Sequence, residues 1–289
     1  MEDQEYLIPE TLQEALKLLR QYGERARVIA GGTSLVIFMK QKLFVPRVLV
    51  DIRRLPELQG ISYQRGVGLD VGAGTSLFEL ETSPVVRERF PVLATMLAQI
   101  ASPRIRCQAT VGGSLCHGEP AADPGPPLMV LGATAVAMGP KGERTISLDS
   151  FFQGYFQTAL APNEILVRIR IPDLSERSGC AYAKYALRKA LDRPMIGVGA
   201  WVRLDRDNST CAEARLAVGA VSPIPVRPRE AEQSLKGQRL GEDAFRRAAE
   251  LAMRAVEPVP DLHASGEYKR EMVGVFTRRA LAAAVAAIG

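Results

Sequence analysis

Two glycine pairs stand out because their surroundings suit the binding of a phosphate. Gly31-Gly32 and Gly112-Gly113 each follow an apolar run and precede a small hydroxyl residue. Glycine adopts positive φ freely and has no Cβ, so successive backbone N–H groups can turn toward one concave point. A phosphate at that point accepts several hydrogen bonds from the backbone. The neighbouring side chains that offer further donors are Thr33, Ser34, Thr110 and Ser114.

Two such loops in one chain can share a pyrophosphate, which indicates a dinucleotide as the ligand. A helix is expected from about Leu35, and its positive end would face the same anion. Neither G-x-G-x-x-G nor G-x-x-x-x-G-K-[ST] occurs in the sequence, so a bound dinucleotide is not held by a standard Rossmann or Walker loop. The alternative, that both glycine pairs are only turn residues, stays open at this point.

The loop after the second glycine pair carries side chains that could contact a ligand. Asp123 precedes Pro124, and a carboxylate on a stiff loop beside a phosphate site suits the hydroxyl groups of ribose or ribitol. An aspartate before proline is equally typical of a turn. His117 is a candidate ligand or proton donor, although a lone histidine commonly serves packing or hydrogen bonding. Glu119 lies four residues before Asp123.

The composition argues against several other functions. The 289 residues include 37 Lys+Arg and 32 Asp+Glu, and the resulting charge of +5 is interspersed rather than clustered. Nucleic-acid binding needs clustered cations with interleaved aromatic residues, so it is not expected. The sequence has two histidines and four cysteines without a C-x-x-C pair. We therefore expect no metal or iron–sulfur site in this chain.

The sequence also indicates a cytoplasmic protein. Four scattered cysteines in a chain of this length suggest reduced thiols. The N-terminal residues Met-Glu-Asp-Gln-Glu are acidic, where a signal peptide would be basic and then apolar. The Ala-rich segment 280–288 is much shorter than the roughly 20 residues that cross a bilayer. We therefore expect no transmembrane segment.

The hydrophobic pattern divides the chain into an α/β unit at 1–58, a second α/β unit at 59–174 and an α+β unit with an antiparallel sheet at 175–289. The strand at 165–171 is expected to be half exposed, because apolar residues alternate there with arginines. Strands are expected over 27–30, 48–52, 61–64, 67–71, 133–138, 145–147, 165–171, 181–187, 196–204 and 214–220. Helices are expected over 12–22, 35–42, 92–101, 242–255 and 269–288.

Several motifs together resemble the FAD-binding medium subunits of the molybdenum hydroxylases. This family includes the flavoprotein subunits of carbon monoxide dehydrogenase and of bacterial xanthine dehydrogenase-type enzymes. The resemblance covers almost the whole chain. The matching pieces are Ala30-Gly31-Gly32-Thr33-Ser34-Leu35, Thr110-Val111-Gly112-Gly113-Ser114 with Pro120 and Asp123, Phe151-Phe152-Gln153-Gly154-Tyr155, Glu164-Ile165-Leu166, Asp261-Leu262-His263 and Tyr268-Lys269-Arg270. One position departs from the family pattern, which usually has Asn where this chain has Ser114.

The resemblance implies an α+β protein. Its parts are a two-lobed α/β FAD-binding domain of the molybdenum hydroxylase flavoprotein (PCMH-type) class and a C-terminal α+β domain with an antiparallel sheet. Backbone N–H groups of both glycine loops would hold the pyrophosphate of a non-covalent FAD, so Gly112→Val is expected to crowd it. Ser114 can still donate one hydrogen bond, so FAD binding is expected to survive the departure from Asn.

The resemblance also implies roles for single residues. Asp123 would bind a polar group of FAD, and Leu166 would lie at the flavin through its main chain. Lys184 would lie near the ring and stabilise negative charge on the reduced flavin. The residues implied to bind FAD are Ala30, Gly31, Gly32, Thr33, Ser34, Leu35, Ile100, Thr110, Gly112, Gly113, Ser114, His117, Asp123, Leu166 and Lys184.

The family role that the resemblance implies is electron transfer. A large subunit with the molybdenum cofactor hydroxylates the substrate, and a small subunit carries two [2Fe–2S] clusters. The FAD subunit then delivers electrons to NAD⁺, a quinone or another acceptor, and the redox chemistry belongs to the cofactor. Two alternatives are a self-sufficient flavin oxidoreductase and a non-catalytic module that binds nucleotides or nucleic acid. The sequence indicates neither the hydroxylated substrate nor the acceptor.

Overall fold

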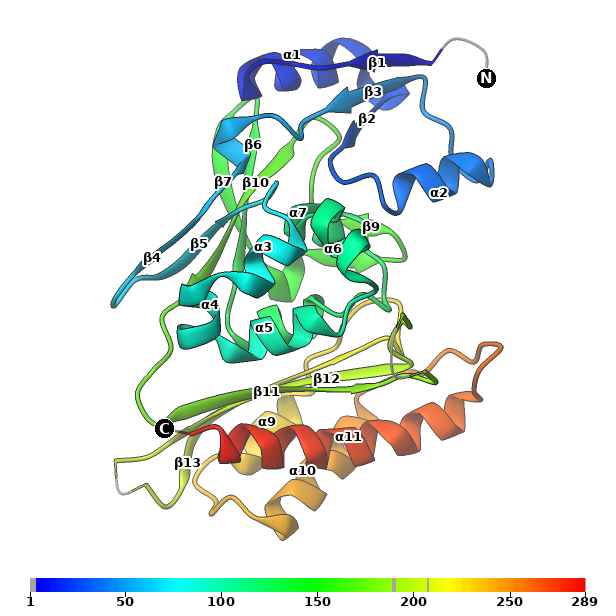
Figure 1. Ribbon diagram of the computed structural model, residues 1–289. Coiled ribbons are helices and arrows are strands. Elements are labelled where there is room, and N and C mark those ends of the chain that lie inside the picture. The colour runs from blue at the N-terminus through cyan, green and yellow to red at the C-terminus, as the bar shows by residue number, and fades with distance from the viewer. Residues whose placement is uncertain (1–3, 189–190, 207, 289) are drawn as a thin grey trace.

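A computed structural model describes residues 4–188, 191–206 and 208–288. Figure 1 shows the N-terminal sheet at the top, a larger central sheet below it, and the C-terminal sheet at the bottom with a layer of helices beneath. The central sheet lies between the N-terminal elements and a group of short helices. No helix in the described part of the chain is long and apolar enough to cross a membrane.

The N-terminal sheet is parallel, in the order β1-β3-β2. Its strands are β1 (Glu5–Leu7), β2 (Ala26–Ile29) and β3 (Val48–Asp51). Helix α1 (Leu12–Tyr22) forms as predicted, because Thr11 caps it: the backbone N–H of Glu14 donates to Thr11 Oγ1 at 3.2 Å. Its apolar face is buried in the N-terminal core. Helix α2 (Leu35–Lys40) follows the first glycine pair and ends two residues earlier than predicted.

The central sheet has five strands in the order β4-β5-β10-β6-β7, and every pairing is antiparallel. These strands are β4 (Ile61–Gln64), β5 (Gly68–Gly72), β6 (Thr134–Gly139), β7 (Gly142–Ser147) and β10 (Ile165–Pro172). The start of β10 is more buried than its sequence indicates, because Ile165, Leu166 and Val167 are all buried. The sheet is covered on both faces there: Ile165 and Val167 pack into the N-terminal core, and Leu166 packs into the central core.

Six short helices lie between β5 and β6, of which the sequence predicted only one. They are α3 (Leu77–Thr82), α4 (Pro84–Arg89), α5 (Pro91–Ala98), α6 (Pro103–Gln108), α7 (Val111–Cys116) and α8 (Gly125–Val130). At six to eight residues each, they are too short to show a clear 3.6-residue period. Their starts are marked instead by proline at the first or second position or by a capping Ser or Thr. A small hairpin, β8 (Phe152–Gly154) and β9 (Gln157–Thr158), follows β7.

The C-terminal sheet is antiparallel in the order β11-β12-β13, as predicted. Its strands are β11 (Ser178–Tyr185), β12 (Ile196–Leu204) and β13 (Cys211–Gly219), followed by helices α9 (Arg229–Leu235), α10 (Glu242–Arg254) and α11 (Gly266–Ala286). On β12, Val198 and Ala200 pack into the core formed with these helices. Trp201 faces the other way and packs into the central core. The C-terminal sheet is therefore joined to the central unit by a continuous apolar contact.

Candidate functional site

A cavity of about 850 Å³ lies where the N-terminal and central elements meet. This volume is at the upper end of the range for small-molecule and cofactor pockets, roughly 300–1,000 Å³. Its walls come from the segment after β2, from α6 and α7, from the start of β10, and from the segment 191–193. These and further lining residues, among them Ala73 and Phe156, come from parts of the chain that are far apart in sequence.

The first glycine loop presents a row of free amides to this cavity. The backbone N–H groups of Gly31, Gly32, Thr33 and Ser34 donate to none of the described residues. Gly32 has a φ of +69°, which glycine adopts without strain. Buried or semi-buried amides are nearly always paired with a partner, so four consecutive unpaired donors indicate a site for an anion.

The second glycine pair differs from the expectation, because its amides are used within the protein. Gly112 and Gly113 belong to helix α7. The N–H of Gly112 donates to the Ala73 carbonyl at 2.9 Å, and the N–H of Gly113 donates to Thr110 Oγ1 at 3.0 Å. A Cβ at Gly112 would lie 2.6 Å from the Ala73 Cβ. Glycine is therefore required at 112 for helix packing, and this pair does not offer the amide donors that the sequence suggested.

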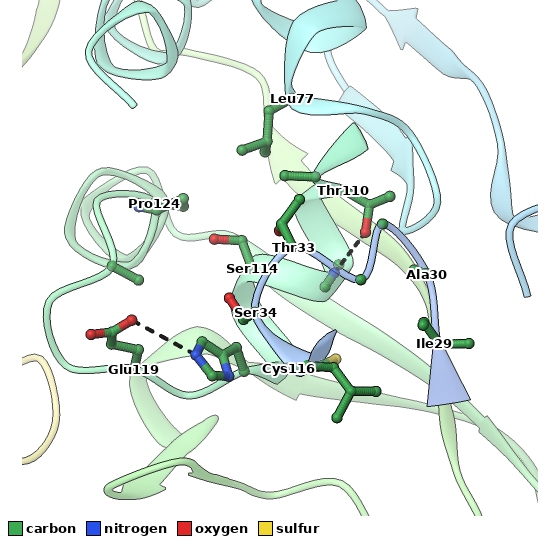
Figure 2. A pocket seen from close by; sticks show the side chains of 18 of the residues that line it. Ile29, Ala30, Thr33, Ser34, Leu77, Thr110, Ser114, Cys116, Glu119 and Pro124 are labelled. Atoms are coloured by element: carbon green, nitrogen blue, oxygen red, sulfur yellow. Dashed lines mark hydrogen bonds and ion pairs between the residues drawn. The ribbon is translucent and has the colours of Figure 1, made fainter. Parts of the chain in front are cut away.

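Hydroxyl groups from both segments still meet in the cavity. Figure 2 shows Thr33 and Ser34 of the first glycine loop beside Ser114 of α7. Their hydroxyl groups form no hydrogen bond with any described residue. The cationic side chains among the described lining residues are Arg27 and Arg193. Arg27 lies over the Phe44 ring at 5.0 Å, and Arg193 pairs with Glu119. An anion here would therefore be bound mainly by neutral donors.

Asp123 lines the cavity and belongs to a buried polar cluster. Its carboxylate accepts hydrogen bonds from the Tyr182 hydroxyl at 2.9 Å and from Lys184 Nζ at 3.0 Å. Both donors are on β11, so the cluster connects the central helices to the C-terminal sheet. Burial raises the pKa of the Asp123 carboxyl, and Lys184 acts against that rise. Burial, together with Asp123, also raises the pKa of Tyr182 well above its ordinary value.

His117 lies in an aromatic cluster at another part of the wall. Its ring packs against Phe38 and Phe156, with centroids 5.3 and 5.1 Å apart. Its Nε2 is buried without a hydrogen-bond partner among the described residues, 3.7 Å from Glu119 Oε2. Burial lowers the pKa of His117, and the charge of Arg193 adds to this effect. The imidazole is therefore neutral at neutral pH.

All but one of the residues that the sequence suggested as binding residues line this single cavity. Lys184 does not line it within the described part of the chain: its ammonium lies behind Asp123 and also donates to the Gln99 carbonyl at 3.2 Å. Sequence reasoning missed the aromatic residues Phe38 and Phe156. Phe38 follows the first glycine loop by one helical turn and was detectable, whereas Phe156 is brought in only by the β8–β9 hairpin.

Comparisons with known proteins identify the family. Residues 2–174 match the model of the FAD binding domain in molybdopterin dehydrogenase, and residues 181–284 match that of the CO dehydrogenase flavoprotein C-terminal domain. The chain belongs to the FAD-binding subunits of the molybdenum hydroxylases. It is 37% identical over 280 residues to the carbon monoxide dehydrogenase medium chain of Hydrogenophaga pseudoflava, with 97% of this chain and 96% of that one covered. It is 33% identical to a xanthine dehydrogenase FAD-binding subunit of Escherichia coli, with 96% and 95% covered.

Solved structures agree with this assignment. A structure of carbon monoxide dehydrogenase from Hydrogenophaga pseudoflava superimposes with a TM-score of 0.95 at 36% identity, covering 99% of this chain and 98% of that chain. Quinoline 2-oxidoreductase from Pseudomonas putida superimposes with a TM-score of 0.91 at 33% identity, covering 98% and 97%. These relatives are subunits of oxidoreductases, so the chain is an FAD-binding oxidoreductase subunit of α+β architecture.

The residues of this FAD-binding subunit suit the cofactor. The unpaired amides of the first glycine loop match the acceptor oxygens of a pyrophosphate. Ile100 and Leu166 give the cavity apolar surface for a ring system. The hydroxyl of Ser114, which pairs with no described residue, would suit a further polar contact. In the described part of the chain, no group of three or more His, Cys, Asp or Glu side chains is placed to hold a metal ion.

Proposed function

We propose that this chain is the electron-transferring subunit of a heteromeric molybdenum hydroxylase. It would take electrons from the [2Fe–2S] clusters of a small partner subunit and pass them to NAD⁺, a quinone or another acceptor. Bound FAD supplies the redox chemistry, because a flavin exchanges electrons both singly and in pairs. The observation that carries the proposal is the cavity whose glycine loop offers four unpaired amides to a pyrophosphate.

The chain's own task would be to bind and orient the cofactor. The amides at 31–34 and the hydroxyls of Thr33, Ser34 and Ser114 would hold the pyrophosphate. Asp123 would accept a hydrogen bond from a polar group of FAD, since a carboxylate has lone pairs beyond the two that Tyr182 and Lys184 use. Leu166 would contact the flavin. Lys184 would act on it through Asp123 rather than by direct contact.

The partners are proposed from the relatives. Those relatives include chains named as the medium chain of carbon monoxide dehydrogenase and as the FAD-binding subunit of xanthine dehydrogenase. One solved relative is described as lacking the Mo-pyranopterin moiety of its molybdenum cofactor. By analogy, we propose a large subunit with the molybdenum cofactor and a small iron–sulfur subunit as the partners of this chain.

We propose the division at 1–58, 59–174 and 175–289, which is supported by the change from the central to the C-terminal sheet between β10 and β11. We also propose a cytoplasmic location, supported by four cysteines that are all free thiols.

The proposal is tested first on the full chain alone and then on the assembled complex. The purified chain should bind FAD and show the visible absorption of a flavoprotein, and it should turn over no organic substrate by itself. With the two partner chains, substrate should reduce the flavin. A chain that remains colourless after addition of FAD would contradict the proposal. Steady turnover of an organic substrate by the isolated chain would favour a self-sufficient flavin oxidoreductase instead.

A further inference from the structure

Two buried cations hold three consecutive backbone carbonyl groups at the edge of the cavity. Lys184 Nζ donates to the Gln99 carbonyl at 3.2 Å. Arg106 Nη1 donates to the Ile100 carbonyl at 2.8 Å and, more weakly, to the Ala101 carbonyl at 3.5 Å. Ile100 and Ala101 both line the cavity. The sequence predicted that a helix would continue to 101, but α5 ends at Ala98 and this turn follows it.

The turn has an unfavourable backbone conformation that needs support. Ala101 has a φ of +43°, in the left-handed region that residues with a Cβ rarely occupy. Such a conformation persists when its surroundings hold it in place, and it is common at ligand sites. The guanidinium of Arg106 provides this support, since it binds the carbonyl groups of the two peptides that flank the Ala101 Cα.

Arg106 is itself fixed by a buried carboxylate. Its Nε lies 2.6 Å from Glu81 Oε2 and its Nη2 lies 3.3 Å from Glu81 Oε1. The two side chains are only 8% and 13% exposed. This paired geometry fixes the plane of the guanidinium, and it directs the remaining nitrogen, Nη1, toward the turn. Glu81 is on α3 and Arg106 on α6, so the ion pair also holds these helices together.

The arrangement determines what the turn presents to a ligand. Arg106 is not among the described residues that line the cavity. The carbonyl oxygens that it binds are therefore directed away from the cavity, which Ile100 and Ala101 both line. If the turn were released, its carbonyl dipoles could face a bound ring, and they would oppose the negative charge of a reduced flavin.

We propose that Arg106, fixed by Glu81, is a positioning residue for the flavin. It keeps the Ile100–Ala101 turn in its left-handed conformation and thereby keeps carbonyl oxygens away from the ring. This inference rests on the proposed function, because it assumes that the cavity holds the flavin. Arg106 would thereby influence the FAD affinity and the flavin midpoint potential although it does not touch FAD.

The test uses the full chain in an FAD titration and a redox titration. Arg106→Gln should weaken FAD binding by about tenfold or more, the effect of losing hydrogen bonds to a charged group. The midpoint potential of the bound flavin should become more negative. Glu81→Gln should change both quantities in the same direction, by less. The matched control is Arg227→Gln, which breaks another buried Arg–Glu pair, with side chains 11% and 6% exposed. It should lower stability and leave both flavin measurements unchanged.

A rescue experiment separates positioning from general stability. Arg106→Lys should lower the FAD affinity and the flavin midpoint potential. The double variant Arg106→Lys/Ala101→Gly should recover much of both losses, because glycine adopts the left-handed conformation without support. These two variants also test the inference if Arg106→Gln fails to fold. A folded Arg106→Gln or Arg106→Lys chain with wild-type affinity and potential would overturn the inference. A wild-type chain that binds no FAD would instead contradict the proposed function itself.

Discussion

The backbone of Gly31 lies directly against the carbonyl group of Gln108. A Cβ at Gly31 would be 1.9 Å from the Gln108 carbonyl oxygen, far inside van der Waals contact. This contact joins the first glycine loop to the C-terminal end of α6. The absence of a side chain at Gly31 therefore allows the first glycine loop and α6, two of the segments that line the cavity, to meet.

Gly31→Ala should weaken FAD binding by more than tenfold, because the added methyl group would push the amide-bearing loop away from α6. The obstructing atoms belong to the backbone, so a rotamer change cannot relieve the clash, and overpacking of this kind costs about 1–3 kcal/mol. The measurement is a titration of the FAD-free chain with FAD. Gly241→Ala is the control, since a Cβ there meets nothing within 4 Å. Equal affinities of the two variants would contradict this explanation.

Gly112→Ala should destabilise the chain even when FAD is absent. The sequence suggested that a side chain at 112 would crowd the pyrophosphate, whereas in the structure its Cβ would collide with Ala73. We expect a loss of about 1–3 kcal/mol in the free energy of unfolding, measured by urea denaturation of the FAD-free chain. If stability is unchanged and only FAD affinity falls, the packing explanation is wrong.

Asp123→Asn should be strongly destabilising, because it leaves the ammonium of Lys184 buried without a countercharge. The side chains of this pair are only 6% and 7% exposed. Removing one partner of a buried ion pair costs about 3–5 kcal/mol. The double variant Asp123→Asn/Lys184→Met should recover much of this loss, which a double-mutant cycle in urea would measure. The exposed pair of Glu242 and Arg278 is the control, and Glu242→Gln should have little effect.

Ser114→Ala should weaken FAD binding about tenfold or more, the equivalent of one hydrogen bond to a charged group at roughly 1.5–3 kcal/mol. Ser114→Asn, which introduces the residue usual in the family, should bind FAD at least as well as the wild type. Ser62→Ala on the exposed side of β4 is the control and should leave the affinity unchanged. If Ser114→Ala matches the wild type, the hydroxyl does not contact FAD.

The stability of the FAD-free chain should decrease as the pH falls below about 6.5, partly because of His117. Burial holds the pKa of His117 below its ordinary value of 6.5. In this range the unfolded chain therefore binds a proton that the folded chain does not, and stability rises with pH. His117→Phe keeps a ring beside Phe38 and Phe156. This variant should make the pH dependence of the free energy of unfolding shallower between pH 5 and 7, roughly the range in which histidine titrates. His263→Gln, at an exposed position, is the control and should leave this pH dependence unchanged. Urea denaturation at several pH values measures both, and parallel curves for the wild type and His117→Phe would contradict the prediction.

Much of the fold follows from local sequence signals. Helix α1 was predictable from the Thr11 cap and its apolar face, and the C-terminal sheet from its alternating strands. The short helices α3, α4, α6, α7 and α8 were not, because each is stabilised by tertiary packing rather than by its own periodicity. The place of β10 between β5 and β6 was also not predictable, since pairing between distant strands leaves no local signal.

By itself, the sequence determined which residues would gather at the site, since fourteen of the fifteen suggested binding residues line one cavity and only Lys184 does not. It also carried enough of the family pattern to indicate FAD. Only the tertiary structure decided how each residue can act. The amides of Gly31 and Gly32 donate to none of the described residues while those of Gly112 and Gly113 are paired, because Ala73 and Thr110 lie beside the second pair. Which donors stay available depends on neighbours brought from elsewhere in the chain, and the spacing of glycines does not contain that information.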